Sequence, residues 1–70
     1  MTWWACLREF EITVEGMPAI VPVRFVVAAA SREEATRLAG AASVAAFRAA
    51  AGDDFPGNPA GPVVVVSDGR

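Results

Sequence analysis

A strand that runs directly into a capped helix is the feature of this sequence that most constrains its fold. Apolar residues recur at alternate positions up to Val27, and Ser31 then precedes Glu34 by three residues. This spacing is typical of a capping box, in which each side chain accepts a hydrogen bond from a backbone N–H at the other end of the first helical turn. The sequence therefore predicts a helix over residues 32–51, followed by Gly52 as a left-handed residue after the helix end.

Two runs of period-two alternation precede this helix, and Gly16-Met17-Pro18 separates them. Such runs predict an antiparallel hairpin over about residues 3–29, with a loop of about five residues. Pairing Val14 with Val21 satisfies both faces of the hairpin and brings Phe10 opposite Phe25. Proline at position 22 lacks an N–H for the ladder, so we expect it at the start of its strand or on a sheet edge.

A third strand is predicted near the end of the sequence. Residues 52–62 form a loop rich in proline and glycine, and the valines that follow predict a strand over 63–67. The helical crossover makes this strand antiparallel to the first, and we expect the two to be neighbours. The predicted fold class is α+β: one domain over residues 1–70, of order ββαβ, with a three-stranded, mainly antiparallel sheet and one helix packed on one face.

The helix is predicted to meet the sheet through an alanine-rich stripe. At 100° per residue, one face collects Ala35, Leu38, Ala39, Ala42, Ala45, Ala46 and Ala49. Val44 and Phe47 lie well off this stripe. Gly40 weakens the helix by roughly 1 kcal/mol relative to alanine, which indicates either close packing at that point or a tolerated defect.

The composition limits the oligomeric state, the cellular compartment and the classes of partner that we expect for this chain. Seventy residues are near the lower limit for a core that folds alone, so we expect a homo-oligomer, a dimer. The single Cys6 cannot close an intrachain disulfide, which favours a reducing cytoplasm. Neither a membrane-length apolar stretch nor a basic secretory start is present. A net charge of -2 gives no electrostatic footprint for nucleic acid, and six arginines without any lysine indicate a GC-rich source.

The residue types exclude most catalytic chemistry. Because histidine and lysine are absent and Cys6 is alone, no usual nucleophile and base pair can be assembled. Asp53 and Asp54 with Asn58 supply hard oxygen ligands, but their spacing is not that of a calcium loop. We therefore expect no catalytic, cofactor or metal site.

The predicted fold leaves apolar side chains without cover. One helix cannot cover both faces of a sheet, and large exposed aromatic residues typically anchor protein interfaces. The candidate partner-binding residues are Trp3, Leu7, Val44, Phe47, Val64 and Val66. Self-association is the leading interpretation. The next is that Trp3 folds over the sheet edge and the valines complete a modest core, and the third is a heterologous protein partner.

The run V-x-A-x-S-x-E-E-A, formed here by Val27, Ala29, Ser31, Glu33, Glu34 and Ala35, resembles a strand-to-helix junction of small phage and mobile-element proteins. Similar hairpin-then-helix layouts occur in DpnD/PcfM-like proteins and in antitoxins resembling HicB, and the resemblance covers residues 8–50. The leading hypothesis, which the apolar face around Trp3 and Leu7 motivates, is a homodimeric, non-enzymatic accessory or inhibitor protein of this phage or mobile-element style that binds another protein. The alternatives are an antitoxin-like or transcription-associated module, and a dimer that binds a small molecule through Trp3, Trp4 and carboxylates.

Overall fold

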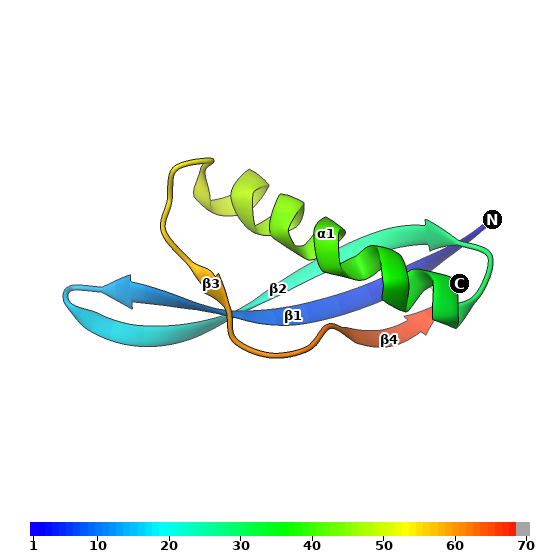
Figure 1. Ribbon diagram of the computed structural model, residues 1–70, viewed down its shortest axis with the longest axis horizontal. Helices are drawn as coiled ribbons and strands as arrows, with labels where there is room; N and C mark the ends of the chain where they lie inside the picture. Colours follow the sequence, from blue (N-terminus) through cyan, green and yellow to red (C-terminus); the bar gives the residue numbers. More distant parts are fainter. Residues whose placement is uncertain (69–70) are drawn as a thin grey trace.

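The computed structural model describes residues 1–68, in which one helix crosses one face of a four-stranded sheet (Figure 1). The elements in chain order are β1 (Thr2–Val14), β2 (Met17–Ala29), α1 (Arg32–Ala51), β3 (Asn58–Pro59) and β4 (Val64–Asp68). The α+β class, the ββαβ layout and the extent of the helix are confirmed. The two-residue strand β3 was not predicted, because it lies inside the proline- and glycine-rich segment assigned to a loop.

Strand β1 is the centre of the sheet, as predicted. It pairs antiparallel with β2 along one edge, while β3 and β4 pair with it one after the other along the opposite edge. A backbone hydrogen bond of 2.9 Å from the N–H of Ala60 to the carbonyl of Glu9 continues the β3 pairing. The β1–β4 ladder has a bulge between Ala5 and Cys6. The long β1–β2 hairpin gives the molecule an extent of 42 Å, against 19 and 18 Å in the other directions.

The hairpin closes through a two-residue turn rather than the five-residue loop that was predicted. Glu15 and Gly16 have positive φ angles of 52° and 81°. Positive φ at both central residues is typical of the type I′ turn, whose twist matches that of the flanking strands. Val14 therefore pairs with Met17 across the turn.

The predicted hairpin register is wrong by four residues along β2. Val21 lies opposite Phe10 instead of Val14, and Phe25 lies opposite Cys6. Hydrophobic alternation does not distinguish registers that differ by an even number, because every side chain stays on the same face of the sheet. The faces predicted for both strands are therefore unchanged.

The core lies between α1 and the inner sheet face, which is the face that the helix covers. Its buried apolar residues are Cys6, Phe10, Val27, Ala29, Ala35, Ala39 and Phe47. Near the start of the helix, alanine methyl groups pack against Cys6 and the end of β2. Near the end of the helix, the rings of Phe10 and Phe47 stack with centroids 4.6 Å apart, and Phe55 packs edge-on against Phe47 at 6.3 Å.

The buried side of the helix differs from the predicted stripe. It follows Ala35, Ala39, Ser43 and Phe47, whereas Leu38 is 43% exposed. Steps of four residues rotate by about 40° around a helix, so this line winds around α1 where the helix crosses a twisted sheet. A straight projection misses that rotation, and for this reason it placed Phe47 off the buried side.

Both ends of the helix are capped, each with a departure from the expected geometry. The N–H of Glu34 donates to Ser31 Oγ at 3.2 Å, and Glu34 Oε1 accepts from the N–H of Ala30 at 2.7 Å, one residue before the cap. At the other end, the N–H of Gly52 donates to the carbonyl of Arg48 at 2.8 Å. Gly52 has φ 107° and ψ 148°, an extended conformation reserved for glycine, instead of the left-handed helical one.

Alanine substitutions at Gly40 and Gly57 are expected to act in opposite directions. Apart from its chain neighbours and the backbone of the helix itself, no atom lies within 4 Å of a methyl group at position 40, so Gly40 is a helix defect and not a close contact. A methyl group at position 57 lies 2.9 Å from Phe47 Cε2 and closer to Cζ, on a ring held by its stack with Phe10. We expect Gly40→Ala to raise the free energy of unfolding by about 0.5–1 kcal/mol. We expect Gly57→Ala to lower it by about 1–3 kcal/mol.

Urea unfolding followed by far-UV circular dichroism measures both effects. Equal midpoints for Gly57→Ala and the natural chain would contradict the close approach of the 52–57 segment to the helix.

Candidate functional site

The sheet face opposite α1, called here the outer sheet face, carries apolar side chains around the first half of β1. Odd-numbered residues of β1 share this face with even-numbered residues of β2, because each odd residue pairs with an even one. Trp3 and Val26 are 57% and 58% exposed, and Leu7 is half-buried between neighbouring strands. Val64 lies opposite Leu7, and both Val64 and Val66 are exposed.

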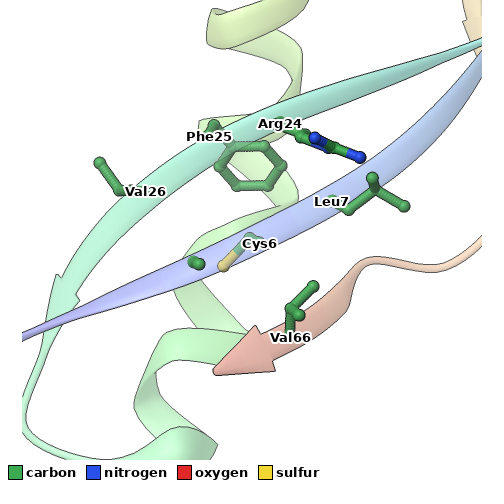
Figure 2. A pocket seen from close by; sticks show the side chains of 7 residues that line it. Cys6, Leu7, Arg24, Phe25, Val26 and Val66 are labelled. Carbon is green, nitrogen blue, oxygen red and sulfur yellow. The ribbon is translucent and has the colours of Figure 1, made fainter. Parts of the chain in front are cut away.

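A shallow depression of about 520 Å³ lies in this face, and Figure 2 shows side chains from three strands around it. Its lining residues are Ala5, Cys6, Leu7, Arg24, Phe25, Val26 and Val66. Ala5 fills little space at this level of the sheet because its side chain is a single methyl group. The guanidinium of Arg24 adds one positive charge to an otherwise apolar surface.

Four of the six predicted partner-binding residues come together on the outer sheet face: Trp3, Leu7, Val64 and Val66. The other two lie on α1, which packs on the inner sheet face. Phe47 is only 6% exposed, so its assignment to the surface is wrong, since its ring belongs to the core. Val44 is half-buried and does not join the outer sheet face.

Sequence reasoning missed two residues of this surface, Arg24 and Val26. The signal that could have found them is the strand parity itself. Because an even residue of β2 stands opposite each odd residue of β1, Arg24 pairs with Leu7 and Val26 with Ala5. Any register of the correct parity puts these side chains on the outer sheet face, and the observed register brings them beside the first half of β1.

Two arginines that contact the core hold the fold together and are not free to bind a ligand. Arg8 Nε donates to the carbonyl of Gly61 at 2.9 Å, and Arg8 Nη1 donates to Ser43 Oγ at 3.0 Å. Arg32 Nη1 donates to the carbonyl of Val65 at 2.8 Å, and its guanidinium lies 5.6 Å from the ring centroid of Trp4. Arg8 thus joins α1 to the segment before β4, and Arg32 joins the start of α1 to β4.

The two adjacent tryptophans have different roles. Trp4 Nε1 donates to the carbonyl of Ala29 at 3.1 Å, and its ring packs against the core cluster. Trp3 points to the opposite face of the same strand and is more than half exposed. Large aromatic residues at exposed positions are typical anchors of protein interfaces. The ring of Trp3 is therefore the largest apolar group that the outer sheet face offers.

The described residues include neither a cluster of metal-ligating side chains nor a helix of membrane-spanning length and apolarity. Within residues 1–68, no three His, Cys, Asp or Glu side chains are grouped so that they could hold a metal ion. No helix in the same range is long and apolar enough to cross a membrane. Cys6 is 2% exposed, its thiol donates to the carbonyl of Trp4 at 3.6 Å, and burial raises the pKa of that thiol.

Comparison with protein-family models, curated proteins and solved structures gave no match to this chain. The resemblance to small phage and mobile-element proteins therefore stays a prediction. The outer sheet face is the feature from which function is inferred below.

Titration of Cys6 is expected to make stability fall at alkaline pH. Because lysine and tyrosine are absent, Cys6 is the only side chain that titrates between about pH 8 and 11. Burial raises its pKa in the folded state, so the folded protein keeps its proton at pH values where the unfolded chain has lost it. Stability is full below the ordinary thiol pKa and declines as pH rises through it.

Urea midpoints measured from pH 7 to pH 10.5 test this expectation. Cys6→Ala is the matched control, and its midpoint should not change across the same range. A flat profile for the natural chain would contradict the burial of the thiol.

Proposed function

We propose that this chain is a non-enzymatic protein–protein interaction protein that forms a homodimer through its sheet and binds a second protein on its outer sheet face. The observation that carries the proposal is the continuity of that face: Leu7, Val26 and Val66 line one depression, and the exposed side chains of Trp3 and Val64 lie on the same face. Contiguous exposed apolar surface is typical of interaction sites and uncommon on small monomers. Its role is that of an accessory or inhibitor protein of the phage or mobile-element kind.

The amount of exposed surface supports self-association. A compact monomer of this mass exposes about 4,200 Å², whereas this chain exposes 4693 Å². Its radius of gyration is 12.6 Å, against about 11 Å for a compact domain of 70 residues. The excess of about 500 Å² is of the order that one partner loses in a modest protein interface.

The size of the core supports the same proposal. Within residues 1–68, seven apolar residues are buried, and three of them are alanines. A fully buried large aliphatic or aromatic side chain contributes about 1.5–3 kcal/mol, and an alanine contributes much less. Domains of this size commonly gain the missing stability from a partner subunit.

Residue chemistry supports a protein partner in a reducing cytoplasm. Histidine, the side chain that most often acts as a general base, is absent, and the net charge of -2 does not favour nucleic acid. Cys6 is a free, buried thiol, as expected where thiols stay reduced.

A dimer that binds a small molecule is the second candidate, and the depression in the outer sheet face is the observation that favours it. Its lining includes Leu7, Val26 and Val66 with the guanidinium of Arg24, a combination suited to an apolar carboxylate. A rise in melting temperature with medium-chain fatty acids that is lost in Arg24→Gln would support this candidate. Equal shifts in the natural chain and in Arg24→Gln would remove it.

The leading proposal predicts the effect of one polar substitution on the outer sheet face. Light scattering over a concentration series should give twice the monomer mass of 7.3 kDa.

Affinity capture from a lysate of the organism that makes this chain tests the binding face. Leu7→Gln should lose a protein that the natural chain retains, because a buried amide without hydrogen-bond partners weakens an apolar interface.

Leu38→Gln is the matched control, since Leu38 is an exposed leucine on α1, away from the outer sheet face. It should retain the same protein. Equal retention by Leu7→Gln and the natural chain would overturn the assignment of the binding face.

A further inference from the structure

The free edge of β2 alternates between residues that bond to β1 and residues that face outward. In an antiparallel pair, every second residue exchanges both backbone hydrogen bonds with its neighbour, and the residues between direct their N–H and C=O groups to the other side. A two-residue turn makes Val14 and Met17 a hydrogen-bonded pair. Odd-numbered residues of β2 therefore bond to β1, and even-numbered residues present their backbone groups at the edge.

Both prolines of β2 occupy outward positions. Pro18 lies opposite Thr13 and Pro22 opposite Glu9, and the β1–β2 ladder continues without a break through both. Since proline has no N–H, each removes one donor from the free edge and none from the ladder. Proline on an edge strand is a known protection against pairing with another strand. The half of β2 near the turn is therefore blocked.

The other half of the edge has no such protection. Arg24, Val26 and Ala28 keep their outward N–H and C=O groups, and within the described part of the chain no strand pairs with this side of β2. The helix packs on the inner sheet face, so it lies in a different layer from the edge. Segment 23–27 reads Val-Arg-Phe-Val-Val, a composition that favours strand pairing.

We infer that the homodimer of the proposed function forms by antiparallel pairing of this edge with the same edge of a second copy, with Val26 opposite Val26 of the second copy. This inference rests on the proposed homodimer and specifies how it is built. Arg24 then lies opposite Ala28 of the second copy, and the three residue pairs make about six backbone hydrogen bonds.

Registers centred on the two neighbouring outward residues, Arg24 and Ala28, are excluded by contacts already described. Centring the pair on Arg24 sets two guanidiniums opposite each other and brings Pro22 into the ladder, where it has no donor. Centring it on Ala28 requires the N–H of Ala30, which already donates to Glu34 Oε1 in the helix cap. The register centred on Val26 meets neither obstacle.

Side chains on the outer sheet face complement this register. Ala28 stands between Trp3, its partner on β1, and Arg24 of the second copy. Because Ala28 carries only a methyl group, the long arginine side chain reaches over it to the exposed ring of Trp3, where a cation–π contact is favourable. The two-fold symmetry of the dimer means that this contact forms twice, once from each copy. The outer sheet faces of both copies join into one apolar surface for the second protein.

Val26→Pro tests the pairing because nature already uses proline at two equivalent positions of this strand. The substitution removes one outward donor at the centre of the interface and leaves the β1–β2 ladder intact. We expect the far-UV spectrum to be retained and the dimer dissociation constant to rise at least about 100-fold, as measured by light scattering or sedimentation. Ile20→Pro is the matched control, since position 20 faces outward but lies outside the pairing segment. It should leave the dimer unchanged.

A crosslinking variant tests the register without weakening the strand. In a Cys6→Ala background, Val26→Cys places two thiols on residues whose Cα atoms lie about 5.5 Å apart, within the range of a disulfide. Mild oxidation should give a covalent dimer for Val26→Cys and none for Ile20→Cys.

The outcomes separate this inference from the proposed function. A natural chain that stays monomeric at all concentrations overturns the homodimer and the edge pairing together. A natural dimer that persists in Val26→Pro, without crosslinking through Val26→Cys, overturns the edge pairing alone. In that case the outer sheet faces are left as the dimer contact.

Discussion

The tight turn at Glu15 and Gly16 determines the pairing of every residue in the β1–β2 hairpin, to which the rest of the sheet is added. Two positive φ angles close the hairpin in the fewest residues, and the strand pairing follows outward from the turn. Because even and odd residues of β1 alternate between the two faces of the sheet, Trp4 lies in the core and Trp3 lies on the opposite face. The turn also places both prolines of β2 where they cost the ladder no hydrogen bond. A turn one residue longer would shift one strand against the other and exchange the faces of its side chains.

Two unlike contacts hold the helix on the sheet. At its start, the alanines of α1 allow a close approach, and Arg32 links the helix to β4 through the carbonyl of Val65. At its end, Phe10 and Phe47 fill a wider gap with stacked rings, and Gly57 lies against them because it has no side chain. Between these ends, Arg8 satisfies the buried hydroxyl of Ser43. The helix thus covers the inner sheet face as far as Phe10, and apolar side chains are left exposed on the outer sheet face and at the hairpin tip, where Val14 and Met17 lie beyond the helix.

Much of this architecture could be predicted because it depends on local chemistry. Ser31 and Glu34 mark the helix start, and alternation assigns the strand faces that bring Trp3 and Leu7 together. The hairpin register could not be predicted from alternation, which repeats every two residues. Phe47 was assigned to the surface because a straight projection takes no account of the angle at which a helix crosses a twisted sheet. Strand β3 carries no strand signal in its own residues, and it pairs only because the loop passes beside β1.

The central place of β1 also governs when the chain can fold during synthesis. One edge of β1 is completed early, when β2 emerges and the hairpin closes. The other edge waits for β4, whose Val64 pairs with Leu7 across an interval of more than fifty residues. Until then a nascent chain presents an unpaired, apolar strand edge, which is the state most prone to misassembly.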